Sequence, residues 1–153
     1  MNIKTYIAAA VLALATAGSA TAKNVMTPKM YMFGFAASFN DSIVHFTDII
    51  DVDSAWVSSK GNFLLGRNLY SSQLRDYLTS CLLDNRVCVV VYDQKRKRLE
   101  KKLLKMRKRY SGSKARRGYD VRTIEASDFR FKPVNMGYYD DNPVTEGDYD
   151  YGE

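Results

Sequence analysis

The residues with the clearest chemical potential are thirteen lysine and arginine side chains between Lys95 and Arg117, a stretch in which Glu100 is the one carboxylate. Thirteen positive charges and one negative charge give a local net charge of +12, against +6 for the whole chain. Cations at this density neutralise phosphate, sulfate or carboxylate groups and bind polyanions in a salt-dependent manner. The sequence therefore predicts an anion-binding surface made of Lys97, Lys101, Lys105, Lys108, Arg109, Lys114, Arg116 and Arg117.

The class of the anionic partner stays open at this point. An anionic polymer, an anionic lipid surface or an acidic protein would each complement such a surface. The cationic face carries no interleaved aromatic residue, so stacking on nucleic-acid bases is not indicated. The alternative is a solvated helix face whose charge only aids solubility.

Two cysteines, Cys81 and Cys88, form a second candidate pair. Cys81 falls on the apolar face of a predicted helix and Cys88 opens the next predicted strand, so their sulfurs could meet where these elements pack. In an oxidising compartment a disulfide over so short a loop would contribute about 2–3 kcal/mol to stability. The alternative is two buried free thiols that pack as small hydrophobic groups.

The motifs of common catalytic and cofactor sites do not occur in the chain. His45 is the single histidine and there is no second cysteine pair, so ligands for zinc are few. Gly-x-Ser-x-Gly, His-Glu-x-x-His, phosphate-loop and dinucleotide-binding patterns are also missing. We predict neither a metal site nor a cofactor, and the sequence favours a protein without catalytic activity.

The elements that position these residues begin with two strands. Residues 30–39 place aromatic side chains on one face, and residues 43–50 are again rich in β-formers after a turn segment. This pattern is typical of a β-hairpin. Asp53 or Ser54 then indicates the cap of a short helix over 55–57.

Two helices and two further strands follow the hairpin. A helix capped by Ser71 or Ser72 is expected to bury Leu74, Tyr77, Leu78, Cys81 and Leu82. Residues 87–92 are a continuous apolar run, typical of a central strand covered on both sides. Residues 94–110 form the basic helix, with an apolar stripe of Leu99, Leu103, Met106 and Tyr110, and residues 119–125 alternate as a last strand.

The expected order is therefore β-β-α-β-α-β in a single α+β domain over residues 23–133. Two helices pack on a mixed sheet in this prediction. The strand, helix and strand between residues 87 and 125 favour a parallel crossover.

Both ends of the chain differ from the domain. Residues 1–22 contain a lysine, an uncharged apolar run and small residues at the −3 and −1 positions of a peptidase site, as in a cleavable signal peptide. We expect cleavage near Ala22, an exported product in the periplasm or outside the cell, and no transmembrane segment in the mature chain. Residues 134–153 are rich in tyrosine and acidic residues and predict a disordered acidic tail.

The stretch from about residue 30 to residue 110 distantly resembles GIY-YIG nuclease domains. MYMFGF and VHFTDI are similar to the two motif strands, SSQLRDYL to the helix with the catalytic arginine, and VVVYDQKRKRLEKKLLKMRKR to the third strand and metal-binding helix. The resemblance implies Arg75 as the catalytic arginine, Glu100 as the metal ligand and Tyr31 in place of a catalytic tyrosine. The chain departs from the family at Met32-Phe33-Gly34 and Phe46-Thr47-Asp48, where Gly-Ile-Tyr and Tyr-Ile-Gly are expected.

Three hypotheses follow from the sequence. The first is an exported, non-catalytic binding or envelope-associated module whose basic helix engages an anionic partner. The second is a metal-dependent nuclease of GIY-YIG type, which requires Arg75 and Glu100 in one cleft. The third makes the aromatic first strand a sheet edge that pairs with another chain.

Overall fold

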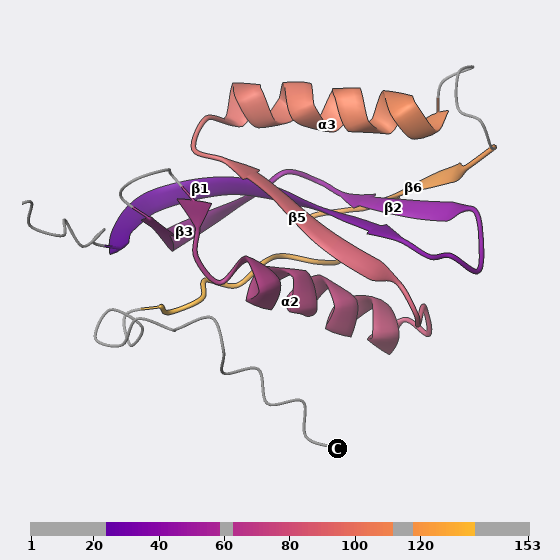
Figure 1. The fold of residues 1–153 in the computed structure, drawn as a ribbon, viewed down its shortest axis with the longest axis horizontal. Coiled ribbons are helices and arrows are strands. Elements are labelled where there is room, and N and C mark those ends of the chain that lie inside the picture. Colours follow the sequence, from indigo (N-terminus) through magenta and orange to yellow (C-terminus); the bar gives the residue numbers. More distant parts are fainter. Residues whose placement is uncertain (1–23, 59–62, 112–117, 137–153) are drawn as a thin grey trace, which may run out of the picture.

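A mixed β-sheet lies between two helices, with α3 on one face and α2 on the other (Figure 1). This computed structural model describes residues 24–58, 63–111 and 118–136. The elements are β1 (Asn24–Ala37), β2 (Ile43–Thr47), β3 (Ile50–Ser58), β4 (Phe63–Leu64), α2 (Arg67–Ser80), β5 (Val87–Asp93), α3 (Arg96–Ser111) and β6 (Asp120–Ile124). The expected α+β class is confirmed, with two strands, β3 and β4, before the first helix that the sequence did not indicate. The signal-peptide prediction and residues 137–153 of the predicted tail lie outside the described residues.

The long strand β1 is the centre of the sheet. Its first half pairs with β3, as in Met30↔Val52, and its end pairs with β2, as in Phe35↔Phe46, both antiparallel. Tyr31 is paired with both Asp51 of β3 and Asp93 of β5, so β5 lies along the opposite edge of β1. The predicted hairpin of β1 and β2 is confirmed. The third hypothesis is wrong, because β1 has strand partners on both edges.

Strand β6 completes the sheet by pairing parallel to β2. Since β1 is antiparallel to both β2 and β5, strands β5 and β6 run in the same direction. The passage from β5 through α3 to β6 is therefore a parallel crossover, as the sequence predicted. It carries α3 across β1 and β2.

The side of the sheet under α2, here called the α2-side core, is mainly aliphatic. Met32 and Ala36 of β1 meet Leu74 and Leu78 of α2, all of them almost fully buried. Gly34 allows this close approach, because a Cβ built there would lie 2.5 Å from Cδ2 of Leu74. The Gly34 N–H also donates to Oγ1 of Thr47 over 2.8 Å, which fixes this point of the sheet.

The opposite side, here called the α3-side core, is mainly aromatic. Phe33 and Phe46 are fully buried there beside Leu99 of α3. Ring centroids of Phe35 and Tyr110 are 5.1 Å apart, so the end of α3 is held by stacked rings. The aromatic face predicted for the first strand is confirmed for Tyr31, Phe33 and Phe35, and it receives α3, but Phe39 lies beyond the end of β1 and is exposed.

Three local predictions were wrong. Residues 55–57 belong to β3 rather than to a short helix. Ile50 and Val52 are buried before Ser54, but Ala55 and Val57 are buried after it, and Ser54 has a left-handed φ of 58°. The alternation of buried and exposed side chains is therefore interrupted at Ser54. In the sequence this interruption looks like the capped first turn of a helix.

Helix α2 also begins and ends earlier than predicted. It starts at Arg67 after Gly66, whose φ of 65° suits a glycine, and it ends at Ser80. Cys81 and Leu82 therefore lie beyond the helix and are exposed, although Leu74 and Leu78 are buried as expected.

The third correction concerns β5. Among the described strands it pairs only with β1, so it is an edge strand and not a central one. Val87 and Val89 are 52% and 44% exposed on its α3 side.

Candidate anion-binding surface

Helix α3 is attached to the sheet by its predicted apolar stripe. Leu99 is fully buried, and Leu103, Met106 and Tyr110 pack partly buried against the α3-side core. These positions lie on one side of the helix, so the opposite side faces solvent. The basic residues next to the stripe can therefore contact the sheet, whereas those far from it are exposed to solvent.

Asp93 at the end of β5 fixes the start of α3. Its Oδ1 accepts a hydrogen bond from the Lys95 N–H over 2.9 Å, and its Oδ2 accepts one from Nζ of Lys102, also over 2.9 Å. Burial alone would raise the pKa of Asp93, but these hydrogen bonds and the nearby cations lower it below its ordinary value. The carboxylate is therefore charged at neutral pH and neutralises one lysine of the helix.

Two further cations beside the stripe are used inside the molecule. Arg96 pairs with Glu100 over 3.1 Å and lies 6.0 Å from the ring centroid of Tyr31. Arg107 donates to Oγ1 of Thr123 and lies 5.6 Å from the ring centroid of Phe46. Together with Lys102, these side chains bind the helix to the sheet and are not available to a partner in the same way.

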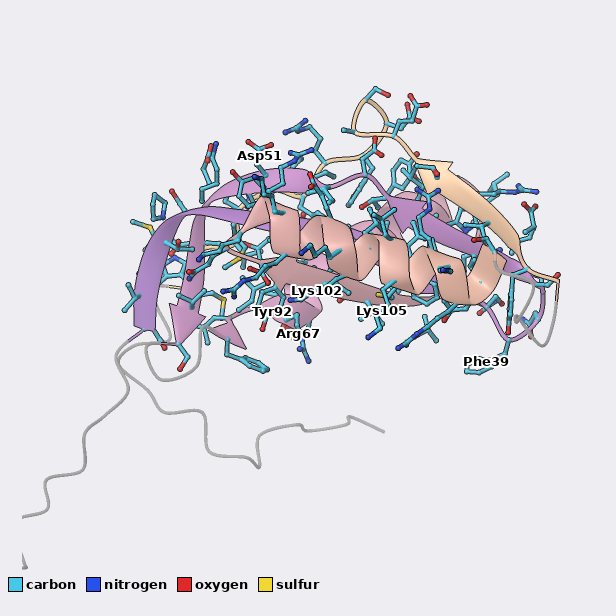
Figure 2. All side chains as sticks on the ribbon, turned by 90° about the horizontal axis from the view of Figure 1, so that it is seen from above. Phe39, Asp51, Arg67, Tyr92, Lys102 and Lys105 are labelled. Carbon is cyan, nitrogen blue, oxygen red and sulfur yellow. The ribbon has the colours of Figure 1, made fainter. Side chains whose placement is uncertain are left out.

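The remaining cations form the outer face of α3. Among the described residues none of them has an ion-pair partner, and all are exposed: Lys97, Arg98, Lys101, Lys105, Lys108 and Arg109. Figure 2 looks onto α3 from this side and shows Lys105 extending away from the helix. Five of the eight predicted anion-binding residues thus lie together on one surface, which we call the outer face of α3. The other three, Lys114, Arg116 and Arg117, lie outside the described residues.

Arg98 belongs to this face although the sequence prediction omitted it. It precedes Lys101 and Lys105 by three and seven residues, at the border of the face nearest Asp93, and its positive charge contributes to the lowered pKa of Asp93. Placing every lysine and arginine of the predicted helix on a helical projection identifies Arg98 from the sequence.

The outer face of α3 is unfavourable to the helix that carries it. Lys97, Lys101, Lys105 and Arg109 follow each other at intervals of four residues, and each like-charge pair at this spacing costs roughly 0.2–0.5 kcal/mol. The first turn has no acidic residue and contains Arg96, Lys97 and Arg98, which oppose the positive end of the helix dipole. Packing of the apolar stripe must therefore hold the helix against its own charges.

The residues implied by the nuclease resemblance are divided between the two faces of the sheet. Tyr31 packs at the α3-side core and Glu100 lies on α3, and Arg96 contacts both. Arg75 is an exposed residue of α2, which covers the other face (Figure 1). The structure does not bring Arg75 to Glu100. In the described ranges, no group of three or more histidine, cysteine, aspartate and glutamate side chains is arranged to hold a metal ion.

The two cysteines are free thiols. Cys81 is exposed beyond the end of α2, whereas Cys88 is buried in the α2-side core, and burial raises the pKa of the Cys88 thiol. The disulfide alternative is therefore not realised. The alternative of two buried thiols holds for Cys88 alone, because α2 ends before Cys81.

Comparison with known proteins gives no relative. No family model, no curated protein and no solved structure matches this chain. Within the described ranges, no helix is long and apolar enough to cross a membrane.

Proposed function

We propose that this protein is a non-catalytic binding module that engages a linear anionic polymer through the outer face of α3. One observation carries the proposal: six exposed cations on one helix face have no carboxylate partner among the residues described. The cations beside the apolar stripe form ion pairs, hydrogen bonds or contacts with aromatic rings inside the molecule. Within the described part of the chain, the cations on the outer face of α3 do not, so they could bind a partner. A partner's anions would relieve the repulsion that the helix now carries.

The geometry favours a polymer over a lipid bilayer. Lys97, Lys101, Lys105 and Arg109 repeat about every 6 Å along the helix, given a rise of about 1.5 Å per residue. A row of evenly spaced charges complements a chain of repeated anionic groups. An interfacial helix instead inserts its apolar side into the membrane, and here that side is buried against the sheet.

Export is part of the proposal. It is supported by the apolar run and the Ala20-Thr21-Ala22 site of the first 22 residues. It would place the outer face of α3 among envelope or extracellular polyanions. Mass spectrometry of the protein from its native cell should find a mature chain that begins at Lys23, and retention of residues 1–22 in that chain would contradict export.

The binding proposal is tested with heparin as the anionic polymer. Replacing Lys101 and Lys105 by glutamine removes two charges from the outer face and keeps good helix formers there. The affinity should fall, and the slope of log affinity against log salt should decrease by about 1 for each lysine removed. The matched control is Lys29→Gln with Lys132→Gln, which removes the same charge from exposed positions outside α3.

Two results would contradict the proposal. Equal losses in the two double variants would show that net charge acts without a defined surface. Binding to phosphatidylserine vesicles in the absence of any binding to heparin would show that a lipid surface is the partner.

The nuclease hypothesis has no observation in its favour here. It needs Arg75 and Glu100 in one cleft, and these residues belong to helices on opposite faces of the sheet.

A further inference from the structure

A groove of about 680 Å³ runs between the first half of α2 and β5. Its helical wall is formed by one flank of α2, at positions separated by three, four and seven residues: Asn68, Ser71, Ser72 and Arg75. Its other wall is the segment 88–90 of β5. The groove thus lies beside the strand that ends the sheet on this side.

The edge of β5 is unusually open to another strand. Among the described strands only β1 pairs with it, so the backbone groups on its outer edge have no strand partner there. Residues 87–92 contain no charge and no proline, the devices that normally protect an edge. An extended segment that entered the groove could therefore add to the sheet through main-chain hydrogen bonds.

The groove is positively charged. Arg67 and Arg75 both line it, and neither has an ion-pair partner among the side chains that the structure describes. Arg67 lies over the ring of Phe63, 5.0 Å from its centroid. The two arginines are about 12 Å apart along the helix axis, at about 1.5 Å per residue, which suits an extended acidic segment.

The chain supplies such a segment next to the groove. Met136 lies against Gly66, a lining residue, because a Cβ built on Gly66 would be 2.9 Å from Sδ of Met136. The residues that follow, 137–153, contain six carboxylates and four tyrosines and no lysine or arginine. Seven extended residues span roughly 23 Å, so the start of this segment has ample length to pass both arginines.

The chain reaches Gly66 by running back along the other flank of α2, past Gln73 and Tyr70, so residues 137–153 must turn at the start of the helix to enter the groove. The Leu64 N–H donates to Oη of Tyr92 over 3.1 Å, which places the end of β5 near the start of α2. A segment that enters at Gly66 and continues toward Arg75 would run antiparallel to β5. Antiparallel ladders form the somewhat more stable pairing.

We propose that residues 137–153 dock in this groove as an additional antiparallel strand on β5, with the acidic side chains on its groove-facing side directed at Arg67 and Arg75. This inference is independent of the proposed function of α3. It directs the acidic segment to the α2 side of the molecule, so the outer face of α3 stays uncovered. A competing acidic, tyrosine-rich peptide would have to displace the chain's own segment.

The test uses the full chain with a nitroxide label on residue 145, made by Thr145→Cys in a Cys81→Ser background that leaves only the buried Cys88. Docking predicts a loss of amide NMR signal at Val89, Val90 and Arg75. Arg67→Glu with Arg75→Glu should restore these signals, and both sites are exposed, so the fold should be kept. Lys101→Gln with Lys105→Gln is the matched control and should leave the losses unchanged.

Three outcomes would overturn the docking. Losses centred on residues 101–109 would show that the segment covers α3 instead. Losses at no described amide would show that it binds neither surface. Losses that pass from a labelled chain to a second, isotopically marked chain in a mixed sample would make the contact intermolecular.

Discussion

The two helices cover opposite faces of one sheet and differ in where their chemistry lies. Helix α2 approaches the sheet so closely that a Cβ at position 34 would lie 2.5 Å from Leu74, and its inner residues Leu74 and Leu78 are almost fully buried. Helix α3 has one fully buried residue, Leu99, and a cationic outer face without local compensation. The inside of α2 therefore stabilises the fold, whereas the like charges on the outer face of α3 weaken their own helix.

The largest expected effect is a loss of stability when the close contact between α2 and the sheet is disturbed. In Gly34→Ala the new methyl group would meet Cδ2 of Leu74 at 2.5 Å and Cγ2 of Thr47 at 3.1 Å, and both of these side chains are almost fully buried. We expect a loss of about 2 kcal/mol in the free energy of unfolding, measured by urea denaturation. Gly118→Ala is the matched control, since its Cβ would meet no atom within 4 Å, and it should change stability by less than about 0.5 kcal/mol. Similar losses in both variants would refute the close approach of α2.

A second prediction contrasts how the two sides respond to acid. His45 of β2 is buried, and burial together with the positive charges of Arg86 and Arg122 lowers its pKa below the ordinary value of 6.5. The unfolded chain therefore takes up a proton at a higher pH than the folded one, so stability is greatest above about pH 6.5 and falls as the pH drops below it. The cations on the outer face of α3 are lysines and arginines and stay charged throughout this range.

Thermal unfolding between pH 5 and pH 8 measures this effect. The melting temperature should fall on the acid side in the native sequence, and the fall should be smaller in His45→Gln. Heparin affinity over the same range should stay constant while the protein is folded. An identical pH dependence of melting in the variant would remove His45 as the cause.

The smallest expected effect tests whether like charges on the outer face of α3 destabilise that helix. Lys101→Glu replaces like-charge contacts with Lys97 and Lys105 by opposite-charge contacts at the same spacing, and it should raise stability by about 0.5–1 kcal/mol. The same change should weaken heparin binding. Lys132→Glu alters net charge equally outside the helix and should do neither. A less stable Lys101→Glu variant would mean that the outer face contributes to the fold.

Local patterns in the sequence predicted the helices, four of the strands and the sign of the surface charge. The stripe from Leu99 to Tyr110 and the burial of Leu74 and Leu78 follow from helical spacing, which depends only on neighbours along the chain. Strand β3 escaped this reasoning because Ser54 changes the phase of its alternation.

Local sequence patterns do not predict where a strand lies in the order of the sheet. β1 and β5 are both apolar, yet the first is central and the second is an edge with Val87 and Val89 exposed. Apolar content shows that a strand is buried on its faces, but it does not show which strand lies at its edge. Spacing along the chain likewise does not tell which face each helix covers, and Arg75 and Glu100 lie on helices that cover opposite faces of the sheet.

The amino-acid sequence alone predicts that a strongly cationic helix follows an apolar strand, and that residues 134–153 are acidic. These are properties of composition and short-range periodicity. Which of these cations are unpaired depends on the fold, because the packing of Leu99 and its neighbours turns some of them toward Asp93, Glu100 and Thr123 and the others toward solvent. The fold also determines that the open edge of the sheet lies beside Arg67 and Arg75, since that juxtaposition arises from residues far apart in the chain.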